Sequence, residues 1–164
     1  MKMKKALDIV EMAIRFISRV FIGAIVAVIF YAVVMRYIFH RPPAWSEELS
    51  RFVFIWMIMF SAVLVTREES HIQITFVLDL LPKTLRFFLS NFVRLLMIGF
   101  CWVMVQQGLR IYPIVAEASS PSFGISMGWL YLSIPVSGIL MGIYIVETIV
   151  KSIVDRVGTA SFKE

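Results

Sequence analysis

The stretch WSEELSR, residues 45–51, sets several polar side chains directly before a long apolar run. Ser46 is a residue type that caps a helix start, and the acidic pair Glu47 and Glu48 complements the positive end of a helix dipole. Arg51 follows these glutamates at i+4 and i+3 spacing, which allows an ion pair along one helix face, and Trp45 suits a membrane interface. The stretch therefore predicts a helix start with Ser46 as its N-cap. Capping and pairing explain these charges without any further function.

The composition indicates the solvent in which this helix lies. Of the 164 residues, 60% are hydrophobic and only 16% are charged, whereas soluble domains carry about 25% charged residues. A soluble domain of this size would expose a large apolar surface to water and would tend to aggregate. The composition therefore predicts an integral membrane protein.

The spacing of the charges predicts the membrane spans. No charged residue falls between Arg19 and Arg36, between Arg51 and Arg67, or between Arg94 and Arg110, and a further charge-free run covers 118–146. A helix needs about 20 residues to cross the hydrocarbon layer, and lipid-exposed backbone must be helical or in a closed barrel. We predict an all-α fold in a single domain, residues 1–164. Its four transmembrane helices are expected at about 16–39, 46–67, 85–112 and 119–147.

Lysine and arginine positions predict the orientation. Four spans place the N-terminus, the connection between the second and third spans, and the C-terminus on one side of the membrane. That side carries twelve of the 16 Lys and Arg residues, and the other side carries four. The positive-inside rule then puts both termini in the cytoplasm. The net charge of +5 is explained by this asymmetry and by attraction to anionic lipid headgroups, so it does not call for nucleic acid.

The N-terminal segment has amphipathic spacing. Leu7, Val10, Ile14 and Ile17 fall on one helical face, and Lys4, Asp8, Glu11 and Arg15 fall on the opposite one. This pattern is typical of a helix lying on the membrane surface. We expect such a helix to lead into the first span, and we expect it not to be a cleaved signal peptide.

Few side chains are suited to catalysis or to cofactor binding. Cys101 is the lone cysteine and lies within the third predicted span, where a thiol usually serves as a small packing residue. His40 and His71 lie near span ends, whereas a haem held inside a helix bundle requires histidines within the spans. We expect no catalytic residue, no metal site and no cofactor. The absence of charges inside the spans also argues against an ion or substrate path through this chain alone.

Other residues suit helix packing and lipid contact. Gly138 and Gly142 form a G-x-x-x-G spacing in the fourth predicted span, as do Gly124 and Gly128. Such residues allow close helix approach, either inside a four-helix bundle or against another subunit, and Pro135 should kink the same helix. Lys83, Arg86 and Arg94 lie along one stripe of the third helix, and they are candidates for contact with lipid phosphates.

Residues 36–82 also carry a resemblance to a known family. The pattern comprises Arg36 with Tyr37, the W-x-E-E-hydrophobic-x-R stretch from Trp45 to Arg51, Arg67, and the pair His71-Ile72. It resembles the small membrane subunit, of the DctQ type, of tripartite ATP-independent periplasmic (TRAP) transporters. Chain length, four spans and the proline of the fourth span also fit this family, so the resemblance covers nearly the whole chain.

The resemblance implies a role in secondary transport across a bacterial inner membrane. In this family a periplasmic binding protein delivers a carboxylate solute, such as sialic acid or a C4-dicarboxylate, to a large permease subunit that moves it with sodium ions. The small subunit is similar to a membrane scaffold for that permease and is not an enzyme. Its expected interface residues are Arg36, Trp45, Glu47, Glu48 and Arg51 at the periplasmic end, and Arg67 and His71 at the cytoplasmic end.

A second hypothesis stays open on the sequence alone. Four apolar helices could also form a free-standing membrane protein, either a small homo-oligomeric exporter or the membrane anchor of another complex. Copurification with a large polytopic permease would favour the transporter subunit, and a stable homo-oligomer with its own transport activity would favour the alternative.

Overall fold

The computed structural model describes residues 2–41, 43–69, 83–122 and 124–160, and the regular elements within these ranges are helices. The helices are α1 (Lys2–Tyr37), α2 (Ala44–Glu69), α4 (Lys83–Ala116), α5 (Gly128–Tyr131) and α6 (Ser133–Ala160). Within the described residues, four segments are long and apolar enough to span a membrane: Leu7–Tyr37, Ala44–Glu68, Phe92–Ala116 and Gly128–Val150. The predicted all-α fold with four candidate spans is confirmed.

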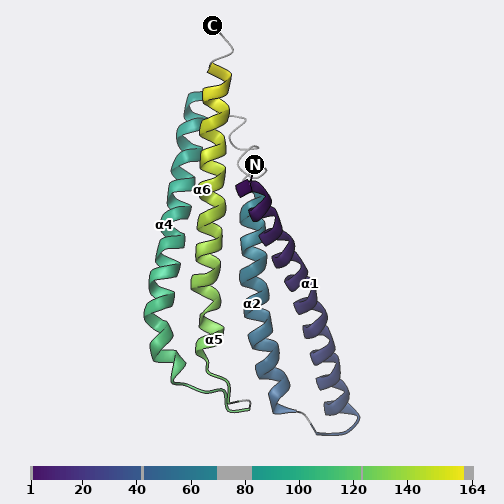
Figure 1. Ribbon diagram of the computed structural model, residues 1–164. Helices are drawn as coiled ribbons and strands as arrows, with labels where there is room; N and C mark the ends of the chain where they lie inside the picture. The colour runs from purple at the N-terminus through teal and green to yellow at the C-terminus, as the bar shows by residue number, and fades with distance from the viewer. Residues whose placement is uncertain (1, 42, 70–82, 123, 161–164) are drawn as a thin grey trace.

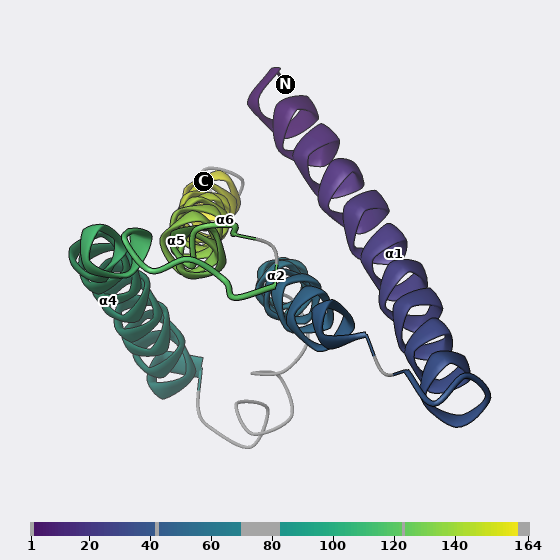
Figure 2. The same ribbon diagram turned by 90° about the horizontal axis from the view of Figure 1, so that it is seen from below.

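The four long helices form an open row in the order α1, α2, α6 and α4 (Figures 1 and 2). α2 packs between α1 and α6, and α4 packs on the other side of α6. In the row, α1 and α4 lie at opposite edges (Figure 2).

The helices alternate in direction along the chain. The α1–α2 and α4–α5 connections lie at one end of the row, which we name the connection end (Figure 1). The start of α1 and the end of α6 lie at the other, which we name the terminal end. Both ends of the helical chain are thus on one side, as four spans require. That this side is cytoplasmic stays a prediction.

The N-terminal segment differs from the expected surface helix. α1 runs without interruption from Lys2 to Tyr37, so the amphipathic segment is the first part of the spanning helix. Ile14 is buried, and Leu7 and Val10 pack beside it against the core. The apolar face of this segment therefore contacts α2 and α6 rather than a separate position on the membrane surface.

The start of the fourth span was also predicted incorrectly. Helical structure begins at Gly128, not at residue 119, because residues 117–122 and 124–127 form a connection in which Ser119 and Ser126 pair in an isolated bridge. Gly124 has φ +66°, a left-handed conformation that glycine adopts without steric cost. A break at Leu132 separates α5 from α6, and Pro135 lies in the first turn of α6, where its missing amide is tolerated. Gly124 and Gly128 therefore do not form a helical G-x-x-x-G pair.

The third helix is longer than predicted. α4 extends over 34 residues, from Lys83 to Ala116, with Pro113 in its last turn. At 1.5 Å per residue its length is about 51 Å. This exceeds the hydrocarbon thickness of about 30 Å, so α4 must tilt or extend into the headgroup region.

The core is small and lies between α2, α4, α6 and the first half of α1. Its buried members are Ile14, Val63, Cys101, Met141, Tyr144 and Ile145. Many large apolar side chains on the outer faces of α1 and α4 remain exposed, including Phe16, Phe30, Phe100 and Trp102. Hydrocarbon tolerates such a surface and water does not, so the burial pattern supports the membrane assignment.

Candidate functional site

The connection end holds most of the predicted interface residues. The helix start there differs from the prediction, because α2 begins at Ala44 and Ser46 lies inside its first turn. The Ser46 hydroxyl donates a hydrogen bond to the Pro43 carbonyl, 2.7 Å away, and so does not serve as the predicted N-cap acceptor. Ser46 is buried at this position.

Spacing along one helix had suggested that Glu47 and Glu48 pair with Arg51, but neither glutamate does so. Glu47 instead accepts a hydrogen bond from Arg36 of α1, with 3.1 Å between Arg36 Nη2 and Glu47 Oε1. Among the described residues, no ion pair joins either glutamate to Arg51. The Arg36–Glu47 pair links the end of α1 to the start of α2 across their connection. Its side chains are 56% and 72% exposed, so the contact lies at the surface.

Glu48 has a different partner from Glu47. It accepts hydrogen bonds from the hydroxyl of Ser120 and from the backbone amide of Ser122, the latter at 3.2 Å. Both donors belong to the α4–α5 connection, which is folded on itself by hydrogen bonds such as that from the Met127 amide to the Ala118 carbonyl, 2.8 Å. Glu48 therefore fastens this connection to the start of α2.

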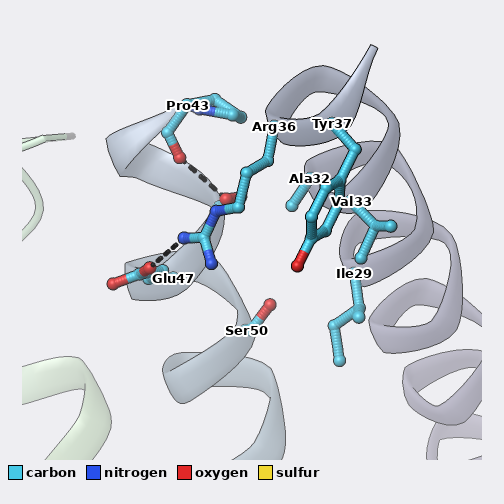
Figure 3. Close-up of a pocket in the computed structure, with 9 residues that line it drawn as sticks. Ile29, Ala32, Val33, Arg36, Tyr37, Pro43, Glu47 and Ser50 are labelled. Atoms are coloured by element: carbon cyan, nitrogen blue, oxygen red, sulfur yellow. Dashed lines mark hydrogen bonds and ion pairs between the residues drawn. The ribbon is translucent and has the colours of Figure 1, made fainter. Parts of the chain in front are cut away.

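Aromatic contacts and a pocket complete the connection end. Trp45 stacks on Tyr31 of α1, with 5.6 Å between the ring centroids. At the same end, a pocket of about 400 Å³ opens between α1 and α2, with Arg36, Glu47 and Ser50 at its polar side (Figure 3). The predicted residues thus lie together at one end of two helices, and the pocket beside them was not predicted.

The terminal end centres on Arg67 of α2. Its guanidinium forms ion pairs with Asp8 and Glu11 of α1 and donates a 2.9 Å hydrogen bond to the Leu7 carbonyl. It also lies over the Tyr144 ring of α6, 5.0 Å from the ring centroid. Only 18% of the Arg67 side chain is exposed. Arg67 therefore joins three helices of this chain. Its part in an interface with another subunit stays a prediction.

Further ion pairs surround Arg67. Arg15 of α1 pairs with Glu11 at 2.7 Å and with Glu68 of α2. Sequence reasoning missed the Glu11 and Glu68 contacts, because the charged face of the N-terminal segment was expected to face water. The sequence did contain a signal for these contacts. The charged face of the N-terminal segment carries Glu11 and Arg15, and the consecutive residues Arg67 and Glu68 carry the opposite charges. His71 lies outside the described residues.

The glycine candidates lie between α6 and α4. A Cβ added to Gly138 would lie 3.1 Å from Val105 Cγ2 and 3.2 Å from the Cys101 carbonyl oxygen. Gly138 therefore packs inside this chain, which is one of the two alternatives that the spacing left open. Gly142 is less crowded, with its added Cβ 3.9 Å from Cys101 Cβ, and it also lines an apolar groove on the surface.

The expected lipid-contact stripe is only partly described. Lys83 and Arg86 belong to α4, but their side chains lie outside the described part of the structure. Arg94 is half-buried on the same helix. Contact of these three residues with lipid phosphates stays a prediction. Within the described residues, no group of three or more His, Cys, Asp or Glu side chains could hold a metal ion.

Charges at both ends and apolar helices between them define a small polytopic membrane protein. A family model described as tripartite ATP-independent periplasmic transporters, DctQ component, matches residues 25–155. The chain belongs to this family and is a small permease subunit of a TRAP transporter.

Similar proteins carry consistent names. The chain is 27% identical over 141 residues to the sialic acid TRAP transporter small permease protein SiaQ of Vibrio cholerae, covering 86% of this chain and 82% of that protein. It is 27% identical over 139 residues to a putative TRAP transporter small permease protein of Haemophilus influenzae, covering 85% and 82%. It is also 30% identical over 118 residues to the sialic acid TRAP transporter permease protein SiaT of Haemophilus influenzae, covering 72% of this chain but only 19% of SiaT.

Proposed function

We propose that this subunit is the fixed membrane scaffold of a sodium-coupled TRAP transporter. In this proposal it holds a large permease subunit in the bacterial inner membrane, with both of its own termini in the cytoplasm. The complex takes up a carboxylate solute, such as sialic acid or a C4-dicarboxylate, delivered by a periplasmic binding protein. Membrane lipids surround the subunit.

The similarity to SiaT is the observation that carries the proposed partnership. A segment similar to most of this chain makes up 19% of SiaT, a protein named as a permease. That permease therefore contains a counterpart of this chain together with a much longer remainder. We infer that a separate large subunit supplies the equivalent of that remainder here, so that the two parts meet in the membrane.

The placement of charges favours a scaffold role for this subunit over a role in conducting the solute. Polar pathways through membranes use ionisable side chains within the spans. Here Arg36, Glu47 and Glu48 lie at the connection end, and Asp8, Glu11 and Arg67 lie at the terminal end. Between these ends the helices pack through an apolar cluster together with small uncharged hydroxyl side chains such as Ser18 and Ser137. Movement of a charged solute would then fall to the partner.

The solute class rests on the named relatives. SiaQ and SiaT carry sialic acid in their names. A C4-dicarboxylate TRAP transporter small permease protein of Vibrio cholerae is 31% identical over 71 residues. Both solutes bear carboxylates, which sets the class that we propose.

The partnership is tested by affinity purification of the tagged subunit from native membranes in mild detergent, followed by quantitative mass spectrometry. We expect one large polytopic permease in about equal amount. Recovery of the chain alone, or only with copies of itself, would contradict the proposal and favour a free-standing protein. A control subunit with the same tag and an unrelated four-helix fold corrects for non-specific recovery.

The transport role is tested by uptake in cells that carry the complete transporter. Uptake of a labelled carboxylate solute should require this subunit and should stop when the sodium gradient is collapsed. We expect Glu48→Ala combined with Arg51→Ala to impair uptake while the subunit still inserts. Unchanged uptake by that double variant at normal expression would assign the connection-end charges to local structure only.

A further inference from the structure

The pocket between α1 and α2 has the polarity of an amphiphile. Ile29, Ala32 and Val33 of α1 form an apolar wall, and Arg36, Glu47 and Ser50 lie at the polar side (Figure 3). The pocket holds about 400 Å³ and is open to the outside of the protein. The apolar wall belongs to the candidate span Leu7–Tyr37, and Arg36 is the next-to-last residue of that span. Because a span ends where acyl chains meet lipid headgroups, we expect the charged pair of the pocket to lie at that depth.

The polar side of the pocket carries one positive and one negative group. Arg36 donates from one guanidinium nitrogen to one oxygen of Glu47, at 3.1 Å. A guanidinium has five N–H donors and a carboxylate has two acceptor oxygens, so each group can bind a second partner. Because both side chains are more than half exposed, a ligand can reach them.

This pair of charges matches a zwitterionic headgroup. We propose that the pocket binds a phospholipid with a primary ammonium headgroup, of the phosphatidylethanolamine class. The lipid phosphate accepts hydrogen bonds from Arg36, the ammonium donates to Glu47, and one acyl chain lies along Ile29, Ala32 and Val33. Guanidinium–phosphate and ammonium–carboxylate contacts are both charge-assisted hydrogen bonds.

Two other lipid classes fit less well. A purely anionic headgroup, such as phosphatidylglycerol, satisfies Arg36 but brings negative charge towards Glu47. A phosphatidylcholine headgroup has the same net charge as phosphatidylethanolamine, but its trimethylated nitrogen has no N–H to donate. Comparison of the three headgroups therefore separates specific recognition from general attraction to the membrane surface.

The full chain, purified with the proteins that accompany it, is placed in nanodiscs that contain phosphatidylcholine with a small fraction of a photoactivatable phosphatidylethanolamine. Cross-linked peptides are then mapped by mass spectrometry, and unlabelled lipids compete for the site. We expect labelling of residues 29–37 and 43–50. Unlabelled phosphatidylethanolamine should compete about tenfold better than phosphatidylcholine or phosphatidylglycerol, which corresponds to about 1.4 kcal/mol. Equal competition by the three lipids, or stronger competition by phosphatidylglycerol, would overturn the proposal.

Variants separate this pocket from the rest of the lipid-facing surface. Glu47→Gln removes the carboxylate charge but keeps the side-chain shape, so the preference over phosphatidylcholine should fall to roughly twofold or less. Ala32→Phe fills the apolar side, and Ala27→Phe is its matched control, because Ala27 is exposed on α1 and does not line the pocket. We expect labelling to fall with Ala32→Phe and to persist with Ala27→Phe. Labelling that is unchanged in Glu47→Gln and Ala32→Phe would mean that only non-specific lipid contact occurs.

Discussion

The two ends of the helix row are held together in different ways. At the terminal end, Arg67 contacts charged groups of α1 and the Tyr144 ring of α6 from a position that is mostly shielded. At the connection end, the exposed ion pair between Arg36 and Glu47 joins α1 to α2, and a pocket lies beside it. Charges therefore fix three helices at one end and leave a ligand-sized space at the other.

The difference indicates a division of labour along the membrane normal. Ion pairs gain strength when water is excluded, whereas exposed pairs contribute little to stability. The terminal end should therefore determine whether α1 stays in the row. The connection end is better suited to contacts with molecules outside the chain, because the polar groups of Arg36 and Glu47 are accessible there.

The largest expected effect is at Arg67. Arg67→Ala removes the shared partner of Asp8 and Glu11 and leaves the partly shielded Glu11 carboxylate with Arg15 alone. Loss of one member of a shielded pair should lower the free energy of unfolding by roughly 2–4 kcal/mol. In a chain of this size that corresponds to a fall in Tm of roughly 5–10 °C, measured by thermal melting in detergent.

Two further variants test the cause of that effect. Arg67→Lys keeps the charge but loses the fork geometry, so it should fall between wild type and alanine. Arg19→Ala removes an exposed arginine of α1 and should change stability by no more than about 0.5 kcal/mol. If the Arg19 and Arg67 variants melted alike, the ion pairs of Arg67 would not be what stabilises the terminal end.

The next effect concerns how α4 meets α6. A Cβ on Gly108 would lie 2.7 Å from Pro135 Cδ, and the rigid proline ring cannot turn aside. Gly108→Ala should therefore force the helices apart and lower the free energy of unfolding by roughly 1–3 kcal/mol. Gly99→Ala, on the same helix, has nothing within 4 Å of the added Cβ. It should be neutral or stabilising by up to about 1 kcal/mol, and a reversed order in the melting temperatures would refute this account of the packing.

The sequence predicts the long helices well because charge-free runs report directly on membrane crossing. It fails at residues 119–122 and 124–127, since serine, proline and glycine carry no charge and yet form a connection rather than a helix. Spacing along one helix suggested that Glu47 pairs with Arg51. The observed partner is Arg36, which the α1–α2 connection brings close with His40 at φ 52°.

The terminal-end cluster was harder to predict than the helices. Its ion pairs depend on how α1 is aligned along α2, and no pattern within either helix determines that alignment. Arg67 was identified by family resemblance. Its partners Asp8 and Glu11 lie far earlier in the chain, and Asp8 is 59 residues away. Opposite charges in the sequence allow such pairs, but tertiary packing decides which of them form.

A local effect is expected at Glu48. Glu48→Ala removes the acceptor for Ser120 and Ser122, so the α4–α5 connection should open more often while the helices remain folded. Hydrogen exchange at the amides of Ser120 and Met127 should become several-fold faster. Glu48→Gln, which retains an acceptor oxygen, should have a smaller effect, and Glu117→Ala is a control at an exposed acidic residue of the same connection. Unchanged exchange in Glu48→Ala would show that the connection is stable without it.

The smallest expected effect is at the exposed pair of the connection end. In a double-mutant cycle, Arg36→Ala and Glu47→Ala should couple by at most about 1 kcal/mol, because solvent screens both side chains. The corresponding cycle for Arg67→Ala and Glu11→Ala should give a larger coupling, because these side chains are only 18% and 23% exposed. Thermal melting of each set in the same detergent measures both values. A coupling energy at the connection end that equals or exceeds the one at the terminal end would show that the terminal end does not hold the row more strongly. The contrast between the two ends would then give no reason to assign binding of an outside partner to the connection end.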